Sequence, residues 1–311
     1  MIRADFYGER SSLELLYIPF FQSAIFDLTG SDLSLIQSRG KSWKLPSQFE
    51  RILTRTVINY PAQKVDFQEQ KFVTGEAGAK YAVRSGKSQL ELIYFSTRED
   101  FPFILYTQPA NLTQNSDPND VGALTFDFDR YLLYGLTYMT DLGGVHIAME
   151  AAASPQRTLV EGLDSNNDGY VDQSRRAHSP WQAVSIELDY LAPSHNYFIK
   201  VGAERSQYFD PPPNLMFASG DSLLFLVYIK LFALDNALSP EFRAINIQTS
   251  SNQWYFSPRL AYSFQNRYSA TMGLNIYTGS GGTPGPAGQD FSPLSILSDN
   301  NQVFFSFRTS F

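Results

Sequence analysis

Residues 268–278 read YSATMGLNIYT, and apolar and polar side chains alternate along them. The apolar and aromatic side chains occupy every second position: Tyr268, Ala270, Met272, Leu274 and Ile276. The positions between them are Ser269, Thr271, Gly273 and Asn275. Successive side chains of a β-strand point to opposite faces, so this stretch predicts a strand with one apolar face and one polar face.

The same alternation recurs along the chain, with charged residues on the polar face. It is clearest in residues 143–151, 183–190 and 197–203. The runs are roughly 9–13 residues long, which is the length that a tilted strand needs to cross a bilayer. Strands of a soluble β-sandwich also have one buried face, but they are usually about 5 or 6 residues long. The lengths favour a transmembrane β-barrel, with the sandwich as the alternative fold.

Predicted connections between the runs alternate between short and long. The short ones lie at residues 8–11, 84–87, 141–144, 192–195, 234–239 and 265–267. The long ones lie at residues 20–71, 98–122, 154–180, 207–221 and 279–300, and the brief connection at 249–253 is an exception. Outer-membrane barrels have short periplasmic turns and longer outer loops. We therefore predict one all-β domain over residues 1–311, an antiparallel transmembrane β-barrel with about 13 strands.

The number of predicted strands is odd, whereas bacterial single-chain barrels have an even number. If residues 84–87 form a periplasmic turn, the first run begins on the outer side. We therefore expect an odd number of strands to be missing from the start of this sequence, and about 14–16 strands in a complete protein.

Composition excludes several classes of function. The chain has no Cys, which rules out disulfides, thiolate metal sites and cysteine nucleophiles. Its net charge is -7, and no cluster of Lys and Arg could bind a phosphate backbone, so we expect no nucleic-acid partner. No apolar run approaches the ~18 residues that a transmembrane helix needs.

The chain ends with QVFFSFRTSF, residues 302–311. A final amphipathic strand that closes on an aromatic residue, here Phe311, resembles the signal by which outer-membrane barrels are recognised for assembly. Together with the strand lengths and the pattern of short and long connections, this end predicts a location in the outer membrane of a Gram-negative bacterium. The expected partners are outer-membrane lipid, lipopolysaccharide and the barrel-assembly machinery.

The stretch IRADFYG, residues 2–8, followed by SLELLYIPFF, residues 12–21, resembles a hairpin of a known family. That family comprises poorly characterised proteobacterial outer-membrane, porin-like β-barrels with an R-A-D-Y-Y…S-L-E…W-I-P-F-F pattern. Tyr17 stands where Trp is usual, and a long insertion-like loop follows Phe21. The resemblance implies a barrel fold, an outer-membrane location and further strands before this hairpin. It does not identify a transported substrate.

The segment DSNNDGYVD, residues 164–172, matches the first nine places of a calcium-binding loop. The expected ligands are Asp164, Asn166, Asp168, the carbonyl of Tyr170 and Asp172. The twelfth place is Arg175, so the usual bidentate Glu is absent, unless Glu161 or a neighbouring loop completes the shell. The alternative is an exposed turn rich in Asn, Asp and Gly that binds no metal.

Charged residues on the polar faces of the runs are candidates for lining a lumen, because outward placement of a basic residue would cost about 2–4 kcal/mol at the bilayer midplane. These candidates are Arg3, Asp5, Glu14, Glu76, Lys80, Glu91, Asp127, Asp129, His146, Glu150, Glu187, Asp189, Lys200, Glu204, Arg259 and Arg308. They predict a pore for small polar solutes or ions. Because both signs are present, a salt-bridged lumen that conducts little is the alternative.

Catalysis is not expected from this sequence. His146, His178 and His195 are the only His residues, and none has a nucleophile elbow or a clear acid or base partner. Two functions are left from the pattern. One is a pore with a charged lumen, and the other is a structural or interaction barrel whose outer loops, ordered by calcium, bind a partner.

Overall fold

The computed structural model describes residues 1–19, 75–99, 103–107, 123–163, 173–194, 196–216, 219–235, 237–249, 251–264, 268–279 and 301–309. Every regular element in these ranges is a β-strand. Among the described residues, no helix is long and apolar enough to span a membrane.

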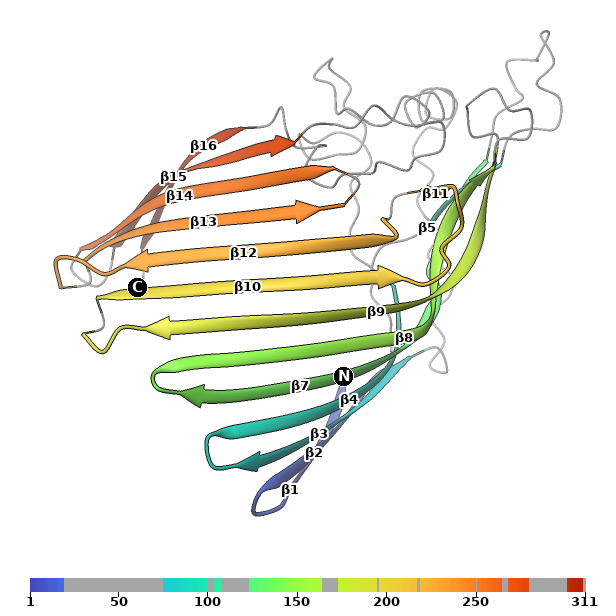
Figure 1. The fold of residues 1–311 in the computed structure, drawn as a ribbon, viewed down its shortest axis with the longest axis horizontal. Helices are drawn as coiled ribbons and strands as arrows, with labels where there is room; N and C mark the ends of the chain where they lie inside the picture. The colour runs from blue at the N-terminus through green and yellow to red at the C-terminus, as the bar shows by residue number, and fades with distance from the viewer. Residues whose placement is uncertain are drawn as a thin grey trace, which may run out of the picture.

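The strands are β1 (Ile2–Tyr7), β2 (Ser11–Ile18), β3 (Glu76–Ser85), β4 (Ser88–Arg98), β5 (Phe103–Thr107), β6 (Ala123–Asp127), β7 (Arg130–Leu142), β8 (Val145–Leu163), β9 (Gln173–Leu191), β10 (Tyr197–Tyr208), β11 (Leu215–Met216), β12 (Asp221–Leu231), β13 (Leu238–Gln248), β14 (Asn252–Phe264), β15 (Tyr268–Gly279) and β16 (Gln302–Thr309). All of them belong to one sheet (Figure 1).

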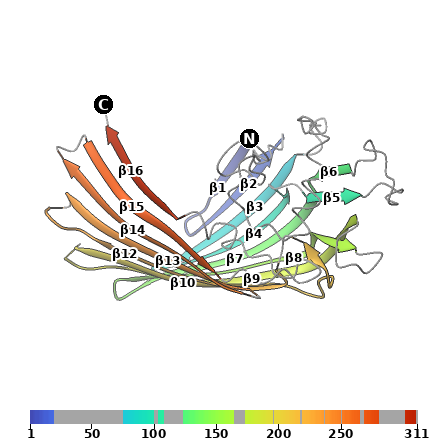
Figure 2. The same ribbon diagram turned by 90° about the horizontal axis from the view of Figure 1, so that it is seen from above.

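Thirteen strands follow one another in the order β1-β2-β3-β4-β7-β8-β9-β10-β12-β13-β14-β15-β16, and each pairs antiparallel with its neighbours. This confirms the predicted all-β antiparallel fold. The sheet curls so that β1 and β16 rise on the same side (Figure 2). Within the described residues, no pairing joins β1 to β16.

Short turns lie at one end of the sheet, at the left of Figure 1, and the longer connections lie at the other end. The β7–β8 turn consists of Gly143 and Gly144, with φ of 59° and 88°. A two-residue hairpin turn needs positive φ to match the strand twist, and glycine adopts it without steric cost. The brief β13–β14 connection is confirmed at the end that carries the long connections.

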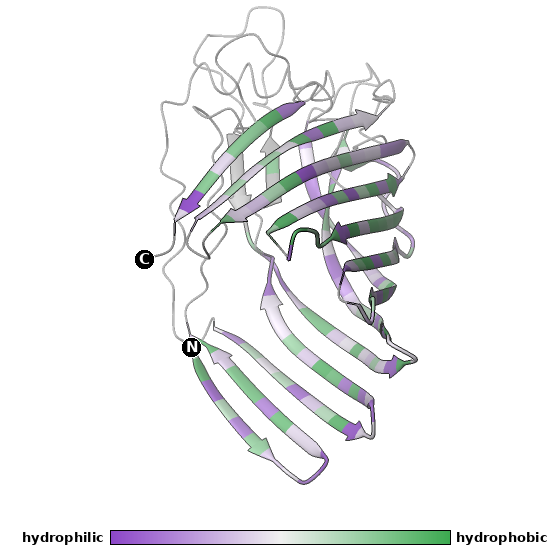
Figure 3. Ribbon diagram, turned by 90° about the vertical axis from the view of Figure 1, so that its left-hand side faces the viewer, coloured by the Kyte–Doolittle hydropathy of each residue, from purple (hydrophilic) through white to green (hydrophobic). Residues whose placement is uncertain are grey.

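The two faces of the sheet differ in chemistry, and residue colours alternate along the strands in Figure 3. Leu92 and Leu136 are register partners on one face and are 51% and 42% exposed. On the other face, only 13% of the Glu91 side chain is exposed. Side chains converge on the concave side of a curved sheet and shield one another there, so the charged face is the concave one.

Aromatic side chains gather on the apolar face toward both ends of the strands. Near the short turns, the rings of Tyr190 and Tyr197 lie 5.9 Å apart, and Phe264 lies 5.3 Å from Tyr268. Near the long connections, Tyr94 lies 5.6 Å from Tyr134, and Trp254 lies 5.5 Å from Phe256. Two aromatic bands at the ends of an apolar face have the arrangement of the girdles that mark membrane interfaces.

The predicted loop at residues 154–180 is wrong, because β8 and β9 continue as a paired hairpin and leave only residues 164–172 between them. The register shifts between Ser154 and Arg157, where the segment Ser154-Pro155-Gln156 interrupts the alternation. Proline lacks a backbone N–H, so it is tolerated at such a bulge. This interruption, and the polar residues beyond it, produced a loop-like pattern in a strand.

Two other predicted loops also contain strands. The predicted loop at residues 98–122 contains β5, which pairs antiparallel with β6. Residues 128–129 lie between β6 and β7. Between the predicted connections at residues 98–122 and 141–144, the sequence pattern predicts one strand, but the structure has two, β6 and β7, which pair with different partners. In residues 207–221, β11 pairs with the extended part of β8 through Leu215 and Glu161.

Candidate functional site

The candidate site is the concave polar face. Cross-strand register and one side-chain hydrogen bond connect a row of polar residues from β7 to β16: Asp141, His146, Asp189, Lys200, Tyr228, Arg243, Ser257, Asn275 and Gln302. A soluble domain would bury such a face only with every polar group paired. An aqueous lumen can hydrate it instead.

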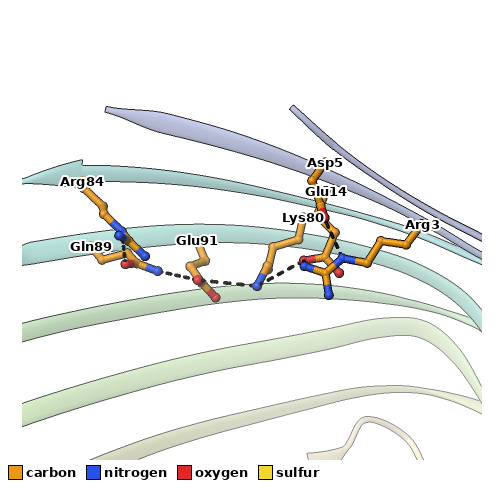
Figure 4. Close-up of polar contacts among 7 residues, drawn as sticks. All are labelled: Arg3, Asp5, Glu14, Lys80, Arg84, Gln89 and Glu91. Carbon is orange, nitrogen blue, oxygen red and sulfur yellow. Dashed lines mark hydrogen bonds and ion pairs between the residues drawn. The ribbon is translucent and has the colours of Figure 1, made fainter. Parts of the chain in front are cut away.

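Charges of opposite sign alternate across β1 to β4 (Figure 4). Arg3 lies 3.3 Å from Glu14, and Lys80 lies 3.6 Å from Glu14 and 3.8 Å from Glu91. Each of the four strands contributes at least one of these side chains. Glu14 and Lys80 are register partners on the neighbouring strands β2 and β3. We call Arg3, Asp5, Glu14, Lys80 and Glu91 the β1–β4 ladder.

Neutral and basic side chains extend the ladder toward the short turns. Arg84 donates from Nε to Oε1 of Gln89 at 2.7 Å, and Gln89 donates to Glu91 at 2.5 Å. Arg3 also donates to Asp5 at 3.0 Å. The carboxylates of the ladder therefore all have described partners, which matches a salt-bridged wall.

Carboxylates dominate the polar face of β7 to β10. Lys200 lies 2.6 Å from Glu187 and 3.5 Å from Asp189, so two acids share one base. Glu150 and Glu204 are exposed, and both lie opposite Ser185 in the register. Within the described part of the chain, neither of these two carboxylates has a hydrogen bond or an ion pair. This sector is acidic and partly uncompensated.

Basic residues dominate the polar face of β12 to β16. Lys230 lies 2.9 Å from Glu241, while Arg243, Arg259 and Arg308 have no ion pair with any described carboxylate. The concave face is therefore divided into an acidic sector on β7–β10 and a basic sector on β12–β16. The strands β14 to β16 rise at the left of the trough in Figure 2, and β1 to β4 rise at its right.

A hydrogen-bonded set of neutral side chains lies beside the basic sector. The hydroxyls of Tyr255 and Ser257 donate to Oδ1 of Asn275 at 2.9 and 3.0 Å, and Asn275 lies 3.4 Å from Gln302. Tyr255, Ser257 and Gln302, with Lys230, Glu241 and Arg243, were missed in the sequence, whereas Asn275 was placed on the polar face of its strand. The strand at 221–231 reads DSLLFLVYIKL, so apolar side chains on both faces hide its parity.

Some predicted lumen residues have other roles in the structure. Glu76 is 8% exposed and accepts hydrogen bonds from the Thr97 hydroxyl and from the backbone N–H of Arg98, the latter at 3.0 Å. Asp129 lies between strands, where it accepts from Thr158 and Arg176, each at 2.8 Å. Both therefore hold structure at the long-connection end. The side chain of Asp127 lies outside the described residues.

The extended β8–β9 hairpin is fixed at that same end by Arg157. Its guanidinium lies 2.7 Å from Glu99, 4.0 Å from the ring centre of Tyr131 and 5.2 Å from that of Trp181. A cation held by an acid and two aromatic faces is well stabilised once it is removed from water. Arg157 therefore anchors the hairpin to the rim of the sheet.

Two predicted sites fall outside the described residues. The calcium loop, with Asp164, Asn166, Asp168, Tyr170 and Asp172, lies entirely there, as does Phe311. Glu161, considered as a further calcium ligand, pairs instead with Arg175 at 2.6 Å. In the ranges that the structure describes, no group of three or more His, Asp or Glu side chains is arranged to hold a metal ion.

Fold and site together define an antiparallel β-sheet, curled around a polar concave face and apolar on its convex face. No known family model and no curated protein matches the chain. Among solved structures, it is similar to OprB of Pseudomonas putida in its high-pH form. That match has 7% sequence identity and a TM-score of 0.46, and it covers 99% of this chain and 71% of the other.

Proposed function

We propose that the chain forms the wall of a transmembrane β-barrel in the outer membrane of a Gram-negative bacterium. Its polar face would line a pore through which small polar solutes or ions diffuse. The observation that carries this proposal is the contrast between the two faces. Every strand of the main path except β10 exposes large apolar side chains on the convex face, while charged residues cover the concave face.

The exposed apolar face must be covered by an apolar partner, because contact between large apolar side chains and water is unfavourable. Monomeric soluble proteins rarely expose contiguous apolar patches above a few hundred Å². The exposed set includes Leu90, Tyr134, Ile186, Phe225, Met272 and Phe305. Lipid is the partner whose geometry fits, because these residues alternate with polar ones on long strands and are bordered by aromatic bands.

The buried residues argue against the soluble sandwich. A sandwich buries one face of each sheet against the other and forms a core between them. Among the described residues, the buried hydrophobic ones are Ala82, Leu159, Val160, Ala192, Leu215 and Ala244. Three of the six are alanines, and Leu159, Val160 and Leu215 lie where β8 meets β11, so the described residues form no core between two layers.

Transport would be passive and would involve no covalent chemistry. Polar solutes would exchange hydration water for the carboxylates, amides and hydroxyls of the concave face. Uncompensated charges there would set the ion preference, because a charged group in a low-dielectric wall focuses its field into the lumen.

Single-channel conductance in a planar lipid bilayer tests the proposal. We expect stable ohmic steps from the refolded protein. Replacing both uncompensated acids, Glu150→Gln and Glu204→Gln, should lower the permeability of potassium relative to chloride. Asp221→Asn is the matched control, because it removes a carboxylate from the convex side, where Asp221 pairs with Arg205 at 2.9 Å. It should leave the permeability ratio unchanged.

A protein that folds, shows heat-modifiable gel migration and never conducts would contradict the pore. The function would then move to the loops, as in the interaction barrel. A protein that conducts with the same ion preference in the double variant would instead remove Glu150 and Glu204 from the lumen wall.

A further inference from the structure

The polar face of β12 to β14 carries more positive charge than its carboxylates can neutralise. Lys230 and Glu241 form a pair at 2.9 Å. Glu241 also lies opposite Arg259 in the register, but no ion pair joins them. Among the described residues, Arg243 and Arg259 therefore have no carboxylate that neutralises them, whereas Arg3 of the β1–β4 ladder pairs with Glu14.

Aromatic rings hold both guanidinium groups in place. The Arg243 guanidinium lies 5.6 Å from the ring centre of Tyr228, and that of Arg259 lies 5.3 Å from the ring centre of Phe304. Arg259 also donates from Nε to Oγ of Ser257 at 3.0 Å. A guanidinium has five N–H donors, so these contacts leave most donors of each side chain for a ligand.

The register brings the two side chains close on one face. Arg243 lies opposite Ser257, which is two residues from Arg259 on the next strand. Diagonal neighbours of this kind lie about 7–8 Å apart at the backbone, within reach of long side chains. Two forked donors at this spacing can bind one oxyanion from two directions.

We propose that Arg243 and Arg259 form a binding subsite for solutes that carry a carboxylate or phosphate group. This inference deepens the proposed pore, because the subsite would lie in its lumen. Asn275 and Gln302 lie in the same polar row as Arg243 and provide amide groups for the uncharged part of such a solute. The solute class would be small polar anions with hydrogen-bonding groups.

Equilibrium binding to the refolded full chain tests the subsite independently of conduction. The probes are inorganic phosphate, followed by phosphorus NMR line broadening, and acetate, followed by proton NMR. We expect Arg243→Gln with Arg259→Gln to weaken phosphate binding at least about tenfold, because several charge-assisted hydrogen bonds are lost. Arg243→Lys with Arg259→Lys should lie between this variant and the wild type, because lysine keeps the charge and loses the fork.

The matched control is Arg3→Gln with Arg308→Gln, which removes two guanidinium groups from the same polar face outside the subsite. It should bind phosphate as the wild type does. Equal weakening in the control and in the Gln variant would overturn the subsite, as would unchanged phosphate binding in the Gln variant. If the Gln variant does not fold, unchanged phosphate binding in the Lys variant would overturn it.

The binding experiment can contradict the subsite without contradicting the pore, and the conductance experiment can contradict the pore without contradicting the subsite. Phosphate binding that depends on Arg243 and Arg259, in a protein that never conducts, would support the subsite and contradict the pore. Conductance with phosphate binding that is insensitive to both arginines would do the reverse. Dependence on the two arginines for both probes would identify any oxyanion as the ligand, and dependence for phosphate alone would restrict the ligand to phosphoryl groups.

Discussion

The β1–β4 ladder and the β12–β14 sector carry their charges in two different ways. In the ladder, Lys80 lies within 4 Å of both Glu14 and Glu91, so each charge has an opposite neighbour. In β12–β14, Arg243 and Arg259 rest on aromatic rings and have no described carboxylate partner. The first arrangement stabilises the wall, whereas the second leaves charge available to a solute.

This difference teaches that charge content alone does not predict selectivity. A paired charge in a wall mainly contributes to folding, and its field is largely cancelled. An unpaired charge contributes little to folding and would project its field into the proposed lumen. Substitutions in the two regions should therefore separate effects on stability from effects on binding.

Within the basic sector, the largest effect on stability is expected from a substitution of Gly273, which lies beside Phe304. A Cβ added there would lie 2.7 Å from Cζ of Phe304 and 2.9 Å from the carbonyl oxygen of Pro258. Gly273→Ala should lower the free energy of unfolding by about 1–3 kcal/mol, because an overpacked site forces ring and backbone to shift. Urea unfolding in lipid vesicles, followed by tryptophan fluorescence, measures it.

Gly202→Ala is the control for this substitution, because Gly202 is also on the polar face. A Cβ added at Gly202 would lie 3.5 Å from its nearest neighbour, the carbonyl oxygen of Ile186. It should change stability much less. If both variants lose the same free energy, then the loss at Gly273 reflects strand propensity and not the contact with Phe304.

A smaller effect is expected from Lys80→Gln in the ladder. The Lys80 side chain is 39% exposed, so solvent screens its pairs, and the loss in free energy of unfolding should be about 1 kcal/mol. Arg243→Gln should lower the same quantity by only about 0.5 kcal/mol, because it breaks no ion pair and loses only the contact with the Tyr228 ring at 5.6 Å. Urea unfolding of the two variants in the same vesicles makes the comparison. Equal losses would remove the distinction between the two regions.

Strand alternation was enough to predict the sheet and the face on which most candidates lie. In residues 268–278, each apolar residue of the period falls on the convex face in β15, and Asn275 falls on the concave face. Glu14, Lys80 and Glu91 also lie on the polar face, as predicted. One-dimensional parity is sufficient in these strands because only one face of each of them is apolar.

Parity could not predict how charges combine between strands. The acidic and basic sectors depend on register, which pairs Lys200 with Asp189 and places Arg243 opposite Ser257. The extended β8–β9 hairpin was also missed, because polar pairs, such as Thr158 with His178, alternate there with apolar residues that fall on both faces, namely Leu159 and Val160. Such a strand is stabilised by side-chain hydrogen bonds and by Arg157, which leave no hydrophobic period in the sequence.

The smallest expected effect concerns the ring beneath Arg259. A double-mutant cycle of Arg259→Gln and Phe304→Leu should give a coupling of about 0.5–1 kcal/mol in the free energy of unfolding, the range for a partly exposed cation–π contact. A second cycle, of Arg3→Gln and Glu14→Gln, measures the exposed ion pair at 3.3 Å in the ladder. Its coupling should fall as salt is added, because mobile ions screen the pair. The Arg259–Phe304 coupling should change less with salt, since a cation held against a ring depends more on contact than on long-range charge. If both couplings vanish together at high salt, Phe304 does not position Arg259 through its ring.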